Sequence, residues 1–170
     1  MRKSGFDRFL TGKDLIGVEV GVNEGDHALA LMKMGNIKLL YLIDPYLVYE
    51  DYSKDTLSKN IDALVGAEEV AKKKVINAGL QHKAKWIKKT SMDAVKDFED
   101  NSLDFVYIDG NHTFKYVLED MEGWLPKVKS EGWIGGHDYR RKQVYKAVNQ
   151  FCADNNYQIT QILEDWLFQK

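Results

Sequence analysis

Short apolar runs alternate with longer segments of helical period along nearly the whole chain. Runs rich in β-branched residues predict strands, and apolar residues repeated every three or four positions predict helices. The predicted strands cover residues 15–20, 39–43, 85–88, 103–108, 132–137, 157–162 and 166–168. The predicted helices cover residues 26–34, 61–79, 91–98, 113–129 and 143–155.

This alternation of strands and helices is typical of a doubly wound α/β fold with a mostly parallel sheet. The last two predicted strands flank a turn at Glu164 and Asp165, as in a closing antiparallel hairpin. The chain of 170 residues has the length of one domain, so residues 1–170 are expected to form a single domain. Residues 46–60 are polar and aromatic and are predicted to form a loop, and loops of this length are uncommon without a function.

Charge and cysteine content narrow the classes of function. The formal net charge is -2, so no overall positive field attracts nucleic acid or an anionic membrane, and we expect neither partner. The single cysteine, Cys152, excludes an internal disulfide and a multi-cysteine zinc site, and it is expected in the core. The chain shows no signal-peptide pattern and no run of about 18 apolar residues, so a cytoplasmic location fits best.

Acidic residues stand at the carboxyl ends of four predicted strands. Glu19 lies near the end of the first strand and Asp44 follows the second. Asp109 follows the strand at residues 103–108, and Asp138 follows the strand at residues 132–137. In open parallel sheets, ligands bind outside the carboxyl ends, where turns bring side chains from separate strands together. The sequence therefore predicts a binding site at this edge of the sheet.

Two glycines and one of these acids indicate the kind of ligand. Gly21 and Gly25 allow a sharp turn and a close approach of the backbone to a ligand. Asp44 follows about 20 residues later, at the end of the next strand, where an acid usually accepts hydrogen bonds from ribose hydroxyls. Together they indicate a nucleoside ligand. The alternative is that the glycines serve only a tight turn and that Asp44 serves only as a cap.

The spacing of the glycines distinguishes between nucleoside ligands. Dinucleotide-binding turns have the pattern G-x-G-x-x-G, whereas this turn has the pattern G-x-x-x-G. The acid Glu19 lies just before the turn, and Glu24 and Asp26 lie within it. Their negative charges would repel a pyrophosphate. These acids suit the cationic amino-acid end and the sulfonium of S-adenosylmethionine.

The chain resembles the class I methyltransferases over residues 17–151. Their first two cofactor motifs are similar to Glu19-x-Gly21-x-x-x-Gly25 and Leu42-Ile43-Asp44. The second half resembles small macrocin-type and other natural-product O-methyltransferases at Val106-Tyr107-Ile108-Asp109-Gly110-Asn111-His112, Asp120, Trp124-Leu125-Pro126, Gly132 and Gly135-Gly136-His137-Asp138-Tyr139. The resemblance implies a Rossmann-like, mostly parallel seven-stranded sheet that ends in a C-terminal antiparallel hairpin.

The same resemblance implies S-adenosylmethionine as the cofactor. Glu19 and Gly21 would contact its methionine end, and Asp44 would contact its ribose. Ser91 and Met92 would contact the adenine, although Ser91 can equally be the N-cap of the helix at residues 91–98, a role that Thr90 can also fill. The implied cofactor-binding residues are Glu19, Gly21, Gly25, Asp44, Ser91, Met92 and Asp109.

Some relatives of this branch, like catechol O-methyltransferase, hold a divalent metal with acids at the ends of the fourth and fifth strands. Asp109 and Asp138 match these positions, and His137 lies beside them, so these three residues form a candidate site for Mg²⁺ or Mn²⁺. A metal-bound hydroxyl loses its proton more readily and is held in line with the methyl group. Because Mg²⁺ prefers oxygen, three alternatives stay open: His137 faces away, it makes the site suit Mn²⁺ or Fe²⁺, or no metal binds.

A histidine in the same segments supplies a candidate catalytic group. The imidazole of His112 can take a proton from a substrate hydroxyl at neutral pH. The predicted catalytic residues are therefore Asp109, His112 and Asp138. The alternative is that His112 or His137 only orders the two loops. His27 and His82 are expected at the surface or as caps.

We therefore predict transfer of a methyl group from S-adenosylmethionine to an oxygen of a small hydroxylated acceptor, such as a sugar, a phenol or a natural product. One alternative is a nicotinamide-dependent oxidoreductase or epimerase, but residues 139–143 lack the Tyr-x-x-x-Lys pair that such enzymes often use. A second alternative is a non-catalytic module that binds S-adenosylmethionine. Unless residues 46–60 form a lid, the pocket is expected to be open or completed by another subunit of a homo-oligomer.

Overall fold

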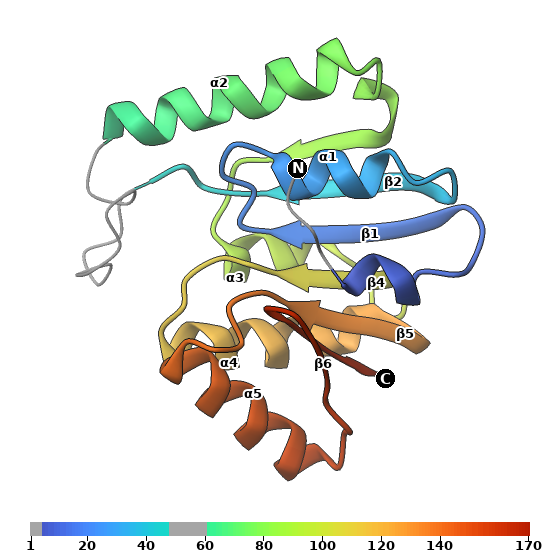
Figure 1. Cartoon of the computed structure of the whole chain (residues 1–170), viewed down its shortest axis with the longest axis vertical. Coiled ribbons are helices and arrows are strands. Elements are labelled where there is room, and N and C mark those ends of the chain that lie inside the picture. Colours follow the sequence, from blue (N-terminus) through green and yellow to red (C-terminus); the bar gives the residue numbers. More distant parts are fainter. Residues whose placement is uncertain (1–4, 48–60) are drawn as a thin grey trace.

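A computed structural model describes residues 5–47 and 61–170, with side chains described from residue 66 onward in the second segment. Helices pack on both faces of one central sheet (Figure 1). The strands are β1 (Leu15–Val20), β2 (Ile37–Ile43), β3 (Ala84–Ile87), β4 (Leu103–Ile108), β5 (Val128–Gly136), β6 (Thr160–Ile162) and β7 (Asp165–Gln169). The helices are α1 (Asp26–Met32), α2 (Ile61–Asn77), α3 (Ser91–Ala94), α4 (Phe114–Trp124) and α5 (Lys142–Asn155). Short 3₁₀ helices are η1 (Phe6–Phe9), η3 (Gln81–Lys83), η4 (Val95–Asp97) and η5 (Leu125–Lys127).

The sheet has the order β3-β2-β1-β4-β5-β7-β6. Its first five strands are parallel, and β7 pairs antiparallel with both β5 and β6. This confirms the predicted seven-stranded, mostly parallel sheet with a closing hairpin. The strand order reverses between β1 and β4, which is the point where open α/β sheets bind ligands. The carboxyl ends of these strands lie on the left in Figure 1.

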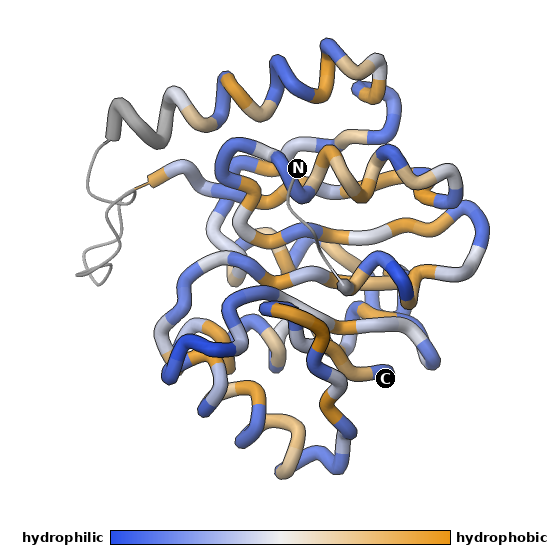
Figure 2. The backbone as a smooth tube through the Cα atoms, in the orientation of Figure 1, coloured by the Kyte–Doolittle hydropathy of each residue, from blue (hydrophilic) through white to orange (hydrophobic). Residues whose placement is uncertain are grey.

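The two faces of the sheet are covered by different helices. One apolar cluster joins the sheet to α3, α4 and α5, and the other joins it to η1, α1 and α2. Strands β1 and β4 are almost fully buried, because parallel strands covered on both faces need apolar residues at nearly every position. Figure 2 shows apolar stretches along the strands, and apolar and polar stretches that alternate along the helices.

Several element boundaries differ from the predictions. The helix predicted at residues 113–129 ends at Trp124, because Pro126 lacks the N–H that a continuing helix would need. Residues 128–131 therefore belong to β5, where Val128 pairs with Leu103. The helix predicted at residues 91–98 consists of α3 and the 3₁₀ helix η4, and the strand predicted at residues 157–162 covers only residues 160–162.

Asp165 belongs to β7, and its predicted place in the turn is wrong. It is buried, and its carboxylate accepts the backbone N–H groups of Gly5 and Phe6 at 2.6 and 3.2 Å. The hydroxyl of Tyr107 in β4 donates to the same carboxylate at 2.8 Å. These bonds explain the burial of Asp165, because a charged group inside a protein is stable only with hydrogen-bond partners. They also attach η1 to the sheet.

Cys152 is buried in α5, as predicted, and burial raises the pKa of its thiol to about 12. Among the described residues, no helix is long and apolar enough to cross a membrane. The loop predicted at residues 46–60, with its proposed role as a lid, lies outside the described residues except for positions 46 and 47.

Candidate functional site

The turn after β1 brings the ends of β1 and β4 together. Gly21 has φ 85° and Gly25 has φ 74°, which are left-handed values that favour glycine. A Cβ atom on Gly21 would collide with the carbonyl oxygen of Asp109. The N–H of Gly21 donates to Ile43 and the N–H of Gly25 to Val22, both at 2.8 Å. The predicted tight turn is therefore present, and it needs glycine for both backbone angle and space.

Asp44, at the end of β2, holds this turn from the side. One of its carboxylate oxygens accepts the N–H groups of Val22 and Asn23 at 2.9 Å, and the other accepts the N–H of Tyr46 at 2.8 Å. Burial raises the pKa of Asp44, and these backbone hydrogen bonds only partly offset that effect. Asp44 is therefore a cap for the turn. A carboxylate has about four acceptor positions, so one position remains for a further donor such as a ribose hydroxyl.

Glu19 is buried against a histidine that was expected at the surface. Oε1 of Glu19 lies 3.2 Å from Nδ1 of His27, and the two side chains are 1% and 2% exposed. The centroid of the His27 ring lies 3.9 Å from that of Tyr107 in β4. The prediction of a surface or capping position for His27 is wrong, because the N-cap of α1 is Gly25 and the first turn of this helix packs His27 onto the sheet. His82 is exposed, as predicted.

The other two acids of the turn have a basic partner. Nζ of Lys74 in α2 lies 2.9 Å from Oδ1 of Asp26 and 3.6 Å from Oε2 of Glu24. This lysine partly neutralises both carboxylates. The turn therefore opposes a pyrophosphate less strongly than its sequence indicates.

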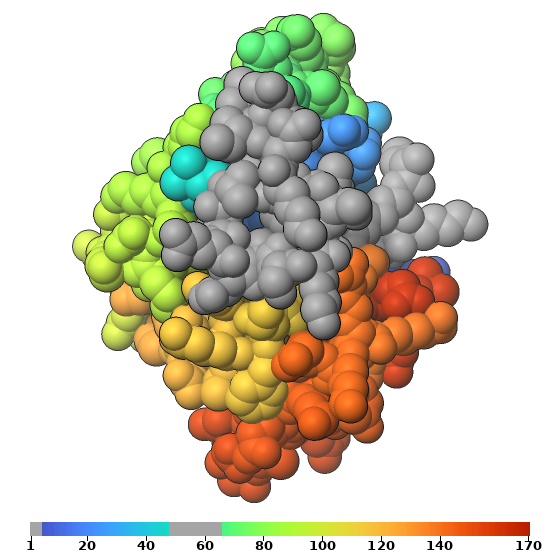
Figure 3. All heavy atoms as spheres, turned by 90° about the vertical axis from the view of Figure 1, so that its left-hand side faces the viewer, coloured from blue at the N-terminus to red at the C-terminus, as the bar shows by residue number. Residues whose placement is uncertain are grey.

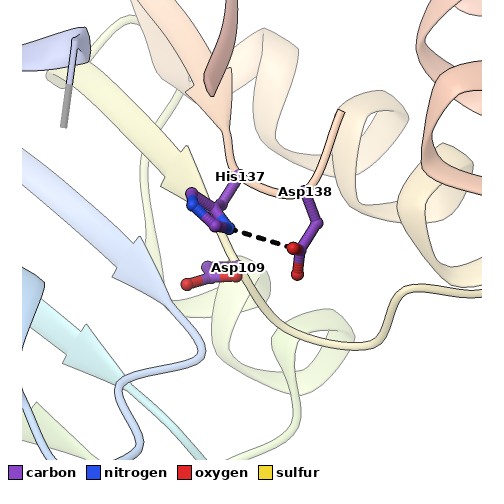
Figure 4. Close-up of side chains that lie close together, drawn as sticks. All are labelled: Asp109, His137 and Asp138. Atoms are coloured by element: carbon purple, nitrogen blue, oxygen red, sulfur yellow. Dashed lines mark ion pairs between the residues drawn. The ribbon is translucent and has the colours of Figure 1, made fainter. Parts of the chain in front are cut away.

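Four predicted site residues meet at the ends of β4 and β5, and we call Asp109, His112, His137 and Asp138 the edge cluster. Nε2 of His112 lies 2.8 Å from Oδ2 of Asp138 and 3.6 Å from Oδ1 of Asp109. Nδ1 of His137 lies 3.2 Å from Oδ1 of Asp138. Figure 4 shows the side chains of Asp109, His137 and Asp138 close together just beyond these two strands. All four residues are partly exposed.

The backbone at Asp138 turns sharply and brings a further residue to the cluster. Asp138 has φ 59°, a left-handed value that aspartate adopts more readily than most residues. Its carbonyl accepts the N–H of Arg141 at 2.8 Å, and Nε of Arg141 lies 3.2 Å from Oδ2 of Asp138. Sequence reasoning missed Arg141. The only signal was its position three residues after Asp138, just before a predicted helix.

Close acid–histidine contacts inside the edge cluster favour its charged forms. Burial by itself lowers the pKa of His112, but the nearby carboxylates of Asp109 and Asp138 outweigh this effect and raise that pKa to about 9. Burial by itself raises the pKa of Asp138, but the contacts with His112 and His137 hold this pKa well below its usual range. In this arrangement His112 is a donor at neutral pH. Service as a general base requires that it first leave Asp138.

The donor atoms of the cluster fit a divalent metal. One carboxylate oxygen each from Asp109 and Asp138 and one ring nitrogen of His137 lie within 4.8 Å of one another. His137 therefore does not face away from the two carboxylates, which excludes the first of the three alternatives. A set of two oxygens and one nitrogen suits Mn²⁺ or Fe²⁺ better than Mg²⁺, which prefers oxygen alone.

Ser91 and Met92 pack against α4. The Ser91 hydroxyl accepts Nε1–H of Trp124 at 2.8 Å and donates to the buried carboxyl of Asp120. Burial raises the pKa of Asp120 to about 7, against the effect of that hydrogen bond. The N-cap of α3 is Thr90, whose side chain accepts the N–H of Asp93, so the capping alternative for Ser91 is wrong. The side chain of Met92 lies over Gly123.

The predicted site residues fall into two groups, those at the carboxyl ends of the strands and those buried inside the protein. Asp109 stands at the junction, because it touches the turn at Gly21 and belongs to the edge cluster. Asp44 joins the same turn. Glu19, Ser91 and Met92 are engaged with side chains inside the protein. The site is therefore most concentrated where β1, β4 and β5 end.

The chain matches the model of a family described as "Methyltransferase domain" over residues 18–139, which is more than half of its length. A relative by sequence is the uncharacterized protein R132 of Acanthamoeba polyphaga mimivirus. It is 28% identical over 148 residues, which cover 83% of this chain and 61% of the viral protein. The chain thus spans about three fifths of that relative.

Solved structures share the fold at low sequence identity. The O-methyltransferase NovP superposes with a TM-score of 0.74 at 17% identity, over 92% of this chain and 72% of NovP. An O-methyltransferase from Bacillus cereus in complex with SAH superposes with a TM-score of 0.67 at 12% identity, over 91% of this chain and 74% of the Bacillus protein. The chain therefore belongs to this family of methyltransferase domains, and in fold it resembles the O-methyltransferases.

Proposed function

We propose that this protein transfers the methyl group of S-adenosylmethionine to an oxygen of a small hydroxylated acceptor. The observation that carries the proposal is the meeting of the glycine turn and the edge cluster at Asp109. In the proposed arrangement, the cofactor lies along the turn between Gly21 and Asp44. The acceptor lies beside Asp109 and Asp138, which face the same edge of the sheet.

The proposed reaction needs few groups from the protein. The acceptor oxygen attacks the methyl carbon, the carbon–sulfur bond breaks with its electron pair on sulfur, and the hydroxyl proton leaves. Asp109 and Asp138 would hold the acceptor hydroxyl in line with the methyl group, because alignment is the main contribution of an enzyme to such a transfer. His112 would take the proton once a substrate or a metal draws Asp138 away from it.

A divalent metal is the second part of the proposal. Asp109, His137 and Asp138 would hold it. Bound there, it would lower the pKa of the acceptor hydroxyl and thereby ease loss of the proton. Mn²⁺ or Fe²⁺ is favoured over Mg²⁺ because His137 supplies nitrogen.

The first test is calorimetric titration of the protein with S-adenosylhomocysteine, alone and with Mg²⁺ or Mn²⁺. We expect binding in the micromolar range. If S-adenosylhomocysteine does not bind and NAD does, the result would support the alternative of a nicotinamide-dependent oxidoreductase.

The second test is turnover with mixtures of sugars, phenols and hydroxylated natural products, with each metal present in turn. We expect S-adenosylhomocysteine to form. Tight cofactor binding without any product from these mixtures would instead support the non-catalytic module.

A further inference from the structure

The segment between β5 and α5 places an arginine at the edge of the proposed reacting centre. Nε of Arg141 lies 3.2 Å from Oδ2 of Asp138, which also contacts His112 at 2.8 Å. The Arg141 side chain is 46% exposed. A guanidinium carries five N–H donors in one plane, so one arginine can bind more than one acceptor group at a time. Arg141 thus stands between the edge cluster and solvent.

The neighbouring arginine is oriented differently. Nη1 of Arg140 lies 2.9 Å from Oε1 of Glu164, and its side chain is 71% exposed. That contact directs Arg140 toward the turn between β6 and β7. Two adjacent arginines therefore have different partners, and only Arg141 contacts the edge cluster.

The surroundings of Arg141 add positive charge and an aromatic surface. Helices α4 and α5 both begin here without an acidic residue in the first turn, and Gln143 of α5 accepts the N–H of Phe114. Lys142 is exposed next to Arg141. Tyr145, one helical turn further, is half exposed and packs against Tyr139 at 5.2 Å between ring centroids. In Figure 3, the yellow segment after β4 and the orange segment after β5 lie side by side on this face.

We propose that Arg141 binds an anionic group of the acceptor, a carboxylate or a phosphate, while the acceptor hydroxyl lies at Asp109 and Asp138. This assignment rests on the proposed function. Arginine suits the role because its planar fork binds carboxylate and phosphate oxygens in pairs. The contact with Asp138 fixes the guanidinium, so less side-chain freedom is lost when the anion binds.

The test follows the ¹H–¹⁵N resonances of Arg141 and the first turn of α5 by NMR during titration with inorganic phosphate and, separately, with benzoate. EDTA is present so that no metal attracts the anions. The titrations are made with and without S-adenosylhomocysteine, so loss of cofactor binding, which would undermine the proposed function, is seen separately from loss of anion binding. A response to phosphate alone assigns a phosphorylated acceptor, and a response to benzoate assigns a carboxylate.

The matched variants are Arg141→Gln and Arg140→Gln. We expect saturable shifts in the wild-type protein, about 10-fold weaker binding in Arg141→Gln, and unchanged binding in Arg140→Gln. Arg141→Lys, which keeps the charge but lacks the fork, should fall between them. If Arg141→Gln fails to fold, the wild-type resonances and Arg141→Lys still decide. Absence of saturable shifts at Arg141, or equal losses in the two glutamine variants, would overturn the proposal.

Discussion

Two acid–histidine contacts lie in opposite surroundings, one against the face of the sheet and one at its carboxyl edge. Glu19 of β1 and His27 of α1 lie 3.2 Å apart and are almost fully buried, with the His27 ring against Tyr107 of β4. His112 and Asp138 lie 2.8 Å apart at the carboxyl edge, where each side chain is 20% exposed. The residue types are nearly the same, but only the second pair can be reached from solvent.

The two pairs differ in whether water or a ligand can replace a hydrogen-bond partner that is lost. The buried pair belongs to a polar row through the core, because the His27 ring packs on Tyr107 and the Tyr107 hydroxyl donates to Asp165. Breaking such a row leaves polar groups in an apolar environment, which is costly. At the edge, water or a ligand can replace a lost partner. We infer that the core row fixes the shape of the site and that the edge cluster carries its chemistry.

The largest effect is expected from Asp138→Asn. This variant removes a charge from the edge cluster without emptying space in the core, so methyl transfer should fall by roughly 100- to 10,000-fold. Turnover with a responsive acceptor measures the loss, and thermal unfolding checks that the fold persists. Asp97→Asn, at an exposed acid paired with Lys89, is the matched control. Full activity in Asp138→Asn would place the chemistry elsewhere.

The next effect concerns stability and tests the core row. Asp165→Ala removes the acceptor for Gly5, Phe6 and Tyr107. Because each buried donor left without a partner costs about 1 to 3 kcal/mol, we expect a loss of about 3 kcal/mol or more in the free energy of unfolding. Urea denaturation measures it, and Tyr107→Phe should lose less. An unchanged midpoint for Asp165→Ala would mean that the core row does not support the fold.

A third prediction concerns Asp44, which lies at the edge but acts on the backbone. Asp44→Ala should weaken S-adenosylhomocysteine binding by about 10- to 100-fold, because hydrogen bonds to a charged group are worth about 1.5 to 3 kcal/mol. Since Asp44 also caps the turn, calorimetry must be paired with thermal unfolding. Normal affinity would remove the ribose assignment, whereas loss of affinity with normal stability would strengthen it.

The smallest predicted effect is a pH dependence of stability caused by Asp120, a second buried acid that lacks a basic partner among the described residues. Its pKa in the folded protein, about 7, exceeds the value of about 3.9 expected after unfolding. The folded state therefore binds more protons between these values, and stability falls as pH rises through this window, by about 2 kcal/mol between about pH 5 and pH 7. Urea midpoints across this range should show the slope in the wild type. Asp120→Asn should flatten it, and an equal slope in this variant would assign the pH dependence to other groups.

Much of the fold follows from the sequence pattern. Alternating strand-like and helix-like segments report which side of each element faces the core, so they identify nearly all of the elements and the mostly parallel sheet. Acids placed directly after strands also indicate the edge at which Asp44, Asp109 and Asp138 would gather, because parallel strands end on the same side.

Only the tertiary structure decided which side chains touch. A histidine in the first turn of a helix has the same local pattern whether it faces solvent or a strand, so the burial of His27 depends on how α1 packs. Asp165 reaches Gly5 across 160 positions of sequence, and the bend at Asp138 brings Arg141 to the edge cluster. Periodicity describes one element at a time, whereas these contacts depend on the packing of several.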